Sequence, residues 1–301
     1  MRRAALVLLP AVLLALPVSA RAAERGTGLA FLRIGVGAQA AGFGNAVVSR
    51  VDDGTATYWN PAGLARVPTL DVTFMHNEHF QDVRYEFLGV ARRIGSHAIG
   101  ASVAGLYTGS DALERRDESG NLEGHFGSYD LAAAVGYARR LGESLTAGVT
   151  AKYLTENIDR TNASGYAFDF GAQWDTPVDR LRLGIAVQNV GPSMKFIADE
   201  FDLPTAVQGG ATYGVPLAGG VVQLAAEVRK VRGDDAGLNV GTGYEYRETA
   251  SVRVGYKSGL DSEDMSFGLG FRRDRVRLDY AFVPYDNDLG DTHRIGLAYR
   301  Y

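Results

Sequence analysis

The sequence has no cysteine, only 9 prolines and no long apolar run after its first residues. The absence of cysteine excludes a disulfide framework and a thiolate metal site. The 31 Lys and Arg residues are outnumbered by 35 Asp and Glu, so no basic surface for nucleic acid is expected. Beyond the amino terminus no apolar run reaches about 18 residues, which excludes a later transmembrane helix.

Glycine and aromatic residues are what the chain has in abundance. It contains 38 glycines, 15 Tyr, 13 Phe and 2 Trp in 301 residues, and 46% of its residues are hydrophobic. That hydrophobic share is enough to bury a core. Together these numbers favour many short strands over long helices.

The amino terminus has the layout of a secretory signal peptide. Met1–Arg3 is cationic, Ala4–Leu16 is an apolar stretch of 13 residues, and small residues follow at Val18–Ala22. A membrane anchor is the alternative, but a span needs about 20 residues. We expect cleavage after residue 22, which leaves 28 basic against 35 acidic residues, a net charge of −7. The protein is therefore expected to be exported.

Apolar and polar residues alternate along most of the remaining chain. In His293–Tyr301, Ile295, Leu297 and Tyr299 lie on one face, and charged or small residues lie on the other. A period of two is the signature of a strand. Such segments are predicted at 69–77, 84–93, 97–108, 125–139, 145–156, 165–175, 180–190, 205–215, 221–231, 237–247, 250–257, 264–272, 276–285 and 293–301.

These fourteen strands predict an all-β fold, a closed antiparallel transmembrane β-barrel over residues 69–301. The connections alternate between short turns and longer loops, including a long one at Asn157–Ser164, as outer-membrane barrels require. The apolar face often ends in an aromatic residue (Tyr107, Tyr137, Tyr153, Trp174, Tyr246 and Tyr256). A secreted soluble all-β protein is the alternative. The barrel predicts a bacterial outer-membrane location, with lipid as a partner.

Residues 23–68 do not follow the strand pattern. They are rich in small residues, with turn signals at Asp52–Gly54 and Asn60–Pro61. A barrel of this size has a lumen, so we expect this segment to enter from the periplasmic mouth as a plug. An ordinary periplasmic extension is the alternative.

Two blocks of sequence resemble a known family. Residues 34–65 and 188–196 are similar to the PorV/PorQ family, a branch of the FadL-like outer-membrane barrels, and the likeness spans nearly the whole mature chain. The first block contains the small-residue run around Phe43 and Asn60–Leu64, and the second contains Gln188–Phe196, closed by Leu203–Pro204. The matched positions of the amino-terminal block are Gly42, Gly44, Asp53, Asn60, Pro61 and Gly63.

The resemblance implies a fourteen-stranded barrel with an amino-terminal hatch. It also implies a role in type IX secretion, in which exported cargo proteins are received and passed to surface attachment. Secretion-system components would then be partners. FadL-like relatives instead carry hydrophobic small molecules across the outer membrane, and this is the alternative function. A structural barrel with no ligand is a third.

The motifs of enzymes are missing. Gly35–Ala40 is close to a dinucleotide fingerprint but has no βαβ unit around it, and no GxSxG or HExxH occurs. His76 and His79 are possible metal ligands, although a solvated loop is the simpler interpretation. We expect no catalytic residue, no metal and no cofactor.

One loop and the carboxy terminus are candidate functional segments. Met194, Phe196, Ile197, Phe201 and Leu203 form an apolar cluster in the expected extracellular loop Gly191–Pro204. Exposed, the cluster would be a surface for cargo or ligand; folded inward, it would pack over the barrel mouth. Tyr299 and Tyr301 resemble the carboxy-terminal signal read by the barrel insertion machinery, a further expected partner.

Overall fold

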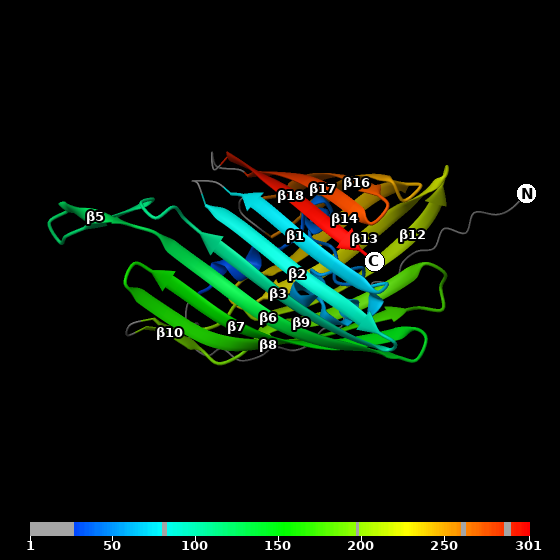
Figure 1. Cartoon of the computed structure of the whole chain (residues 1–301), viewed down its shortest axis with the longest axis horizontal. Helices are drawn as coiled ribbons and strands as arrows, with labels where there is room; N and C mark the ends of the chain where they lie inside the picture. Colours follow the sequence, from blue (N-terminus) through cyan, green and yellow to red (C-terminus); the bar gives the residue numbers. More distant parts are fainter. Residues whose placement is uncertain (1–26, 80–82, 197–198, 260–262, 286–289) are drawn as a thin grey trace, which may run out of the picture.

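Fourteen strands form a closed antiparallel barrel, which confirms the predicted fold class (Figure 1). The computed structural model describes residues 27–79, 83–196, 199–259, 263–285 and 290–301. The barrel closes where β1 pairs with β18, with Asp71 opposite Arg300. The barrel strands are β1 (Leu70–Glu78), β2 (Arg84–Ile94), β3 (His97–Tyr107), β6 (Ser128–Leu141), β7 (Leu145–Ile158), β8 (Thr161–Asp175), β9 (Leu181–Val190), β12 (Ala206–Leu217), β13 (Gly220–Val231), β14 (Ala236–Tyr246), β15 (Ala250–Lys257), β16 (Met265–Arg273), β17 (Val276–Tyr285) and β18 (Gly290–Arg300).

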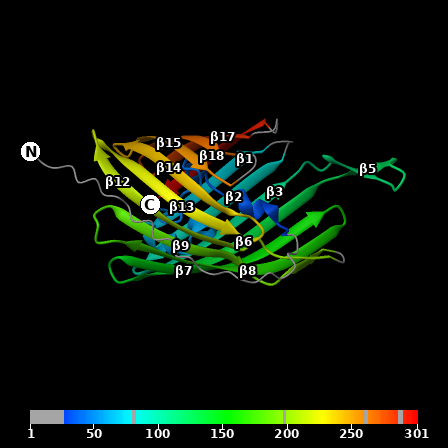
Figure 2. The ribbon, with the colours of Figure 1, turned by 180° about the vertical axis from the view of Figure 1, so that it is seen from behind.

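The two ends of the barrel differ in their connections. We call the end that holds the start of β1 and the end of β18 the turn end, because the links there are short. The other end, the loop end, carries two additional hairpins that the alternation did not predict. These are β4 (Leu113–Arg116) with β5 (Leu122–Phe126), and β10 (Met194–Phe196) with β11 (Asp199–Phe201). The first hairpin projects beyond the barrel in both views (Figures 1 and 2).

One predicted loop is wrong. The sequence pattern placed a long loop at Asn157–Ser164, but β7 and β8 continue pairing until Ile158 faces Thr161. The link is therefore a tight turn at Asp159 and Arg160, with Asp159 at a positive φ of 54°. Polar residues such as Asn162 look like loop sequence, yet they extend the ladder beyond the apolar belt. Loop length consequently does not alternate strictly around the barrel.

The two faces of the barrel wall have opposite character. Apolar side chains point outward; in β18, Ile295 and Leu297 are exposed while Arg294 and Ala298 are buried inside. The six aromatic residues that end the predicted apolar faces are all at least 36% exposed. This is the outward belt that a lipid-facing barrel requires. Within the ranges described, no helix is long and apolar enough to cross a membrane.

Residues 27–68, which we call the hatch, lie inside the barrel, where the blue segment is seen in Figures 1 and 2. Four short helical elements shape it: η1 (Ala30–Arg33), α1 (Ala38–Gly42), α2 (Ala56–Trp59) and η2 (Pro61–Arg66). Residues 1–22, the predicted signal peptide, lie outside the described residues.

The hatch runs the length of the lumen. It begins at the loop end, where Thr27 bridges Asp202, and finishes at the turn end, where Leu70 and Tyr301 exchange backbone hydrogen bonds. The segment that we expect as a plug from the periplasmic mouth thus crosses the lumen and reaches both mouths. Phe31 and Trp59 of the hatch share one buried core with wall residues such as Phe87.

Candidate functional site

The contact between the hatch and the barrel wall is the candidate site. One side of the contact is built mainly from neutral amides, together with one carboxylate, Glu227, whose Oε2 accepts from Val48 N at 2.8 Å. On β8, β9 and β12, Gln173, Gln188 and Gln208 point inward and donate to backbone carbonyls of the hatch. Gln173 Nε2 lies 3.1 Å from both Val48 O and Val51 O, and Gln208 Nε2 lies 2.8 Å from Trp59 O.

Gln188 completes this neutral side by donating to the Tyr58 carbonyl. All three glutamines are buried. Buried carbonyls without partners are costly, so these amides hold the irregular hatch backbone in place. The sequence analysis does not name these glutamines. Their positions alternate with the apolar residues of the predicted strands, and this alternation could have placed them inside the barrel.

Asn60 joins the hatch to the wall at a point where no side chain fits. Its Nδ2 donates to Val48 O at 2.7 Å and also lies 3.2 Å from Ala172 O. Its Oδ1 accepts from Ala62 N and would lie 2.0 Å from a Cβ added at Gly171. Only glycine at 171 allows this approach.

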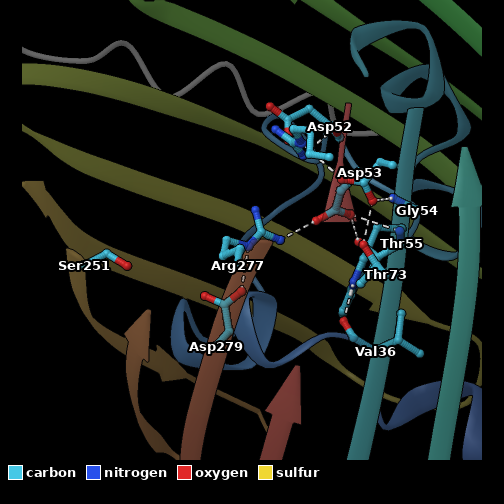
Figure 3. Close-up of polar contacts among 12 residues, drawn as sticks. Val36, Asp52, Asp53, Gly54, Thr55, Thr73, Ser251, Arg277 and Asp279 are labelled. Carbon is cyan, nitrogen blue, oxygen red and sulfur yellow. Dashed lines mark hydrogen bonds and ion pairs between the residues drawn. The ribbon is translucent and has the colours of Figure 1, made fainter. Parts of the chain in front are cut away.

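The opposite side of the contact is ionic (Figure 3). Arg277 Nη2 lies 3.1 Å from Asp53 Oδ2 of the hatch, and Arg277 Nε lies 2.7 Å from Asp279 Oδ2. Asp279 Oδ1 is in turn 2.8 Å from Arg253 Nη1. This last pair reaches across β16, where a Cβ at Gly270 would come within 2.7 Å of both partners.

A second ionic group lies beside the first. Arg300 bonds Asp71 Oδ2 at 3.0 Å and Asp52 Oδ1 at 3.1 Å. Asp71 Oδ1 accepts from the backbone N–H of Gly54 at 2.9 Å, so the wall carboxylate also holds the hatch turn. We call the residues of both groups the ionic latch: Asp52, Asp53, Asp71, Arg253, Arg277, Asp279 and Arg300.

The chemistry of the latch favours one position of the hatch more than it adds stability. A buried ion pair loses hydration that offsets most of its attraction, but removal of one partner leaves a costly unpaired charge. Burial alone would raise the pKa of Asp52, yet Arg300 and Arg277 hold that pKa below its ordinary value of 3.8. Asp52 therefore stays ionised at neutral pH.

A cavity of about 670 Å³ lies at the turn end, and Asp53, Arg277 and Arg300 of the latch line part of it. Arg50, Asp52, Arg182 and Glu245 are among the charged residues that line it. The Arg50 guanidinium stands 4.0 Å above the Phe43 ring. Burial and the nearby Arg253 lower the pKa of Arg50 to about 10. The cavity is thus a vestibule of mixed lining, in which charged groups alternate with apolar side chains such as Val47 and Leu181.

The residues of the resembling amino-terminal block all lie at the hatch–wall or hatch–hatch contacts. Asp53 is in the latch, and Asn60 and Pro61 face the neutral side. The glycines mark close approaches: a Cβ at Gly42 would be 3.0 Å from Gly268 Cα, at Gly44 2.8 Å from Tyr256 N, and at Gly63 2.4 Å from Val51 O.

The apolar loop cluster folds inward, which is one of the two placements left open by the sequence. Met194 and Leu203 are buried, and Phe196 and Phe201 are half-buried against the core. The Phe201 ring occupies the space that a Cβ at Gly28 would need, at 2.4 Å. Ile197 lies outside the described residues.

The remaining candidates have structural surroundings. His76 Nδ1 pairs with Glu86 Oε1 at 2.7 Å. Among the described residues, no group of three or more His, Asp or Glu side chains is arranged to hold a metal. Gly35–Ala40 lies in the hatch, where Val36 O accepts from the Trp59 indole at 2.9 Å. Tyr299 and Tyr301 are 40% and 57% exposed at the turn end.

Solved structures share this architecture. The toluene transporter TodX of Pseudomonas putida superposes with a TM-score of 0.60 at 13% identity, covering 88% of this chain and 96% of that one. The monoaromatic hydrocarbon channel CymD gives a TM-score of 0.61 at 13% identity, covering 89% and 98%. At sequence identities this low, the superpositions show a common fold and nothing more.

Comparison with known sequences places the chain in a family. A search of curated proteins gives no match. A family model described as "Uncharacterised protein family (UPF0164)" matches residues 20–215, which is 196 of the 301 positions. The protein belongs to this family, UPF0164.

Proposed function

We propose that this protein is an outer-membrane channel for hydrophobic small molecules whose lumen the hatch closes at rest. The outward apolar belt supports a membrane location, and the shared fold with TodX and CymD supports transport. The observation that carries the proposal is the ionic latch, which joins Asp53 of the hatch to Arg277 of the wall.

Passage through this barrel requires the hatch to move. The hatch side chains pack with wall residues in one buried core, and the turn-end cavity that remains is lined by many charged groups. An apolar molecule would bind poorly among those charges. A hydrophobic molecule can therefore pass only when the hatch separates from the wall. The two sides of the hatch–wall contact oppose this separation through different interactions. Charged contacts respond to pH and salt, whereas the amide contacts do not.

Uptake of a hydrophobic dye tests the proposal. The dye 1-N-phenylnaphthylamine fluoresces on reaching phospholipid and is excluded by an intact outer membrane. Cells that make the wild-type protein should take up the dye faster than cells with an empty vector, and Asp53→Asn should be several-fold faster still. The matched control is Asp235→Asn, an exposed loop carboxylate. Equal uptake in all four strains would contradict the proposal.

A second candidate function is the PorV/PorQ-type cargo shuttle. It is supported by the two blocks that resemble the PorV/PorQ family, residues 34–65 and 188–196. The blocks are in contact in the structure, where Gln188 donates a hydrogen bond to Tyr58 O. Phe196 and Phe201 remain half-exposed at the loop end, within reach of a cargo protein.

A crosslinked pull-down from the native outer membrane separates the two functions. Recovery of exported proteins or secretion components, reduced when Phe196 and Phe201 are replaced with Ser, would support the shuttle. Recovery of hydrophobic small molecules alone would support the channel. Unchanged cargo recovery with both replacements would count against this loop.

A further inference from the structure

Three arginines at the turn end have no acidic partner in the part of the chain that the structure describes. Arg247 lies in the turn between β14 and β15, and Arg273 and Arg275 flank the turn between β16 and β17. All three side chains are exposed. Among the described residues, no carboxylate lies within 4.0 Å of any of them. We call these three residues the basic arc.

The three arginines lie along one continuous stretch of rim. The two turns touch, since Arg272 N donates to Thr249 O at 2.6 Å. The end of β18 continues the stretch, with Arg300 N donating to Arg275 O at 2.8 Å. Glu248 and Asp274 are the acidic residues of these two turns, and Glu248 approaches Arg272 only to 4.0 Å. Positive charge therefore predominates along this part of the rim.

Arg275 and Arg247 contact rings of the outward aromatic belt, and Arg273 shares the outward face of β16 with Phe271. The Arg275 guanidinium stands 4.1 Å from the centre of the Tyr301 ring and donates to the Tyr299 hydroxyl at 3.4 Å. The Arg247 guanidinium stands 5.1 Å from the Tyr246 ring. These tyrosines and Phe271 are 40% to 57% exposed on the outer face. Aromatic rings at this level mark the headgroup layer of a bilayer.

The β4–β5 hairpin at the loop end has the opposite charge balance. The β4–β5 hairpin and its flanks carry five acidic side chains (Asp111, Glu114, Asp117, Glu118 and Glu123) against Arg115 and Arg116. The excess of arginine along the basic arc is thus not repeated in this hairpin.

We propose that the basic arc binds the phosphate of anionic phospholipids in the membrane leaflet that surrounds the turn end. Guanidinium groups form paired hydrogen bonds to phosphate oxygens, and the aromatic rings beneath them contact the upper acyl chains. Basic side chains near a bilayer surface attract anionic lipid, and their effects add. This proposal is independent of what the lumen transports.

Native mass spectrometry of the full-length protein in neutral detergent tests the arc. The protein is titrated with phosphatidylglycerol or phosphatidylcholine. Wild type should retain phosphatidylglycerol in preference to phosphatidylcholine. The triple variant Arg247→Gln, Arg273→Gln, Arg275→Gln should lose phosphatidylglycerol affinity on the order of a hundredfold. The matched control replaces three exposed loop-end arginines, Arg84, Arg116 and Arg160, with Gln and should bind as wild type does.

Three results would overturn the proposal: equal phosphatidylglycerol retention by wild type and arc variant, equal retention of the two lipids by wild type, or displacement of phosphatidylglycerol by millimolar inorganic phosphate. Heat-modifiable migration on gels shows that each variant is folded. If the triple variant does not fold, Arg275→Gln alone should weaken binding by about fivefold, and no change in that variant would equally overturn the arc.

Discussion

Arg277 of β17 and Asp53 of the hatch lie 224 positions apart in sequence, yet Arg277 Nη2 is 3.1 Å from Asp53 Oδ2. Both side chains are buried, and Arg277 also pairs with Asp279. The ion pair that joins the hatch to the wall therefore uses an arginine, Arg277, that is also paired with a wall carboxylate, Asp279. Such an arrangement allows Arg277 to keep one ion pair when the hatch leaves.

Replacement of Asp53 by Asn should loosen the hatch while the barrel stays folded. Loss of the carboxylate removes one charged contact, at a cost of about 1–3 kcal/mol. The chain has two tryptophans, of which Trp59 is buried in the hatch and Trp174 is exposed outside. In a Trp174→Phe background, Trp59 emission should shift to the red in Asp53→Asn and remain unchanged in Asp235→Asn. Identical emission in both variants would show that Asp53 does not hold the hatch.

A methyl group at position 171 should disturb the neutral side of the contact. A Cβ there would lie 2.0 Å from Asn60 Oδ1, so Gly171→Ala must displace Asn60 and its hydrogen bonds. We expect a loss of about 1–3 kcal/mol in the free energy of unfolding, measured by urea titration in detergent. Gly209→Ala is the matched control, because its Cβ would meet nothing closer than 3.9 Å. Equal stability of the two variants would refute this close contact.

The latch should weaken in acid through Asp52. Arg300 and Arg277 outweigh burial and hold the pKa of Asp52 below its ordinary value of 3.8. A carboxyl group whose pKa is lowered in the folded state stabilises that state above pH 3.8. This stabilisation is lost as the pH falls through the lowered pKa. Trp59 emission should therefore shift to the red as pH falls below about 4. The red shift of Trp59 emission should be smaller in Asp52→Asn than in wild type. A red shift of the same size in Asp52→Asn would show that groups other than Asp52 cause it.

Loss of Gln173 should weaken the hatch without any dependence on salt. Its Nε2 donates to Val48 O and Val51 O, and Gln173→Leu leaves two buried carbonyls with fewer partners. We expect a loss of about 1–3 kcal/mol. Hydrogen exchange of the backbone around residues 48–51 should increase equally at low and high salt. The exchange caused by Asp53→Asn, in contrast, should depend on salt. Equal salt dependence of the two variants would contradict the division into neutral and ionic sides.

The barrel strands were predictable because their alternation is a local property. Every predicted strand overlaps an observed one. The agreement arises because the alternation of inward and outward side chains can be seen within each strand, without knowledge of its neighbours. The β10–β11 hairpin has only three residues in each strand, too few for a period to show. The turn at Asp159 was missed because the strands extend past the apolar belt, where alternation ceases.

The candidate site was only partly predictable. The period of two puts Arg253 and Asp279 on the face opposite the apolar one, toward the lumen. In the same way it puts Lys152 and Asp169 inward on adjacent strands, where they pair at 2.6 Å. It did not reveal that Arg253 reaches Asp279 across β16, because that contact depends on the glycine at 270. The partners of Asp53 depend on the path of the hatch, which no periodic pattern encodes.

Single-channel conductance in planar bilayers tests the ionic latch most directly. Wild type should be closed for most of the record, and Asp53→Asn should open more often with the same open conductance. Raising the salt concentration should increase wild-type opening but change Asp53→Asn less, because salt screens the charged contact that the variant lacks. Equal open fractions for wild type and Asp53→Asn at every salt concentration would contradict the claim that this ion pair holds the hatch closed.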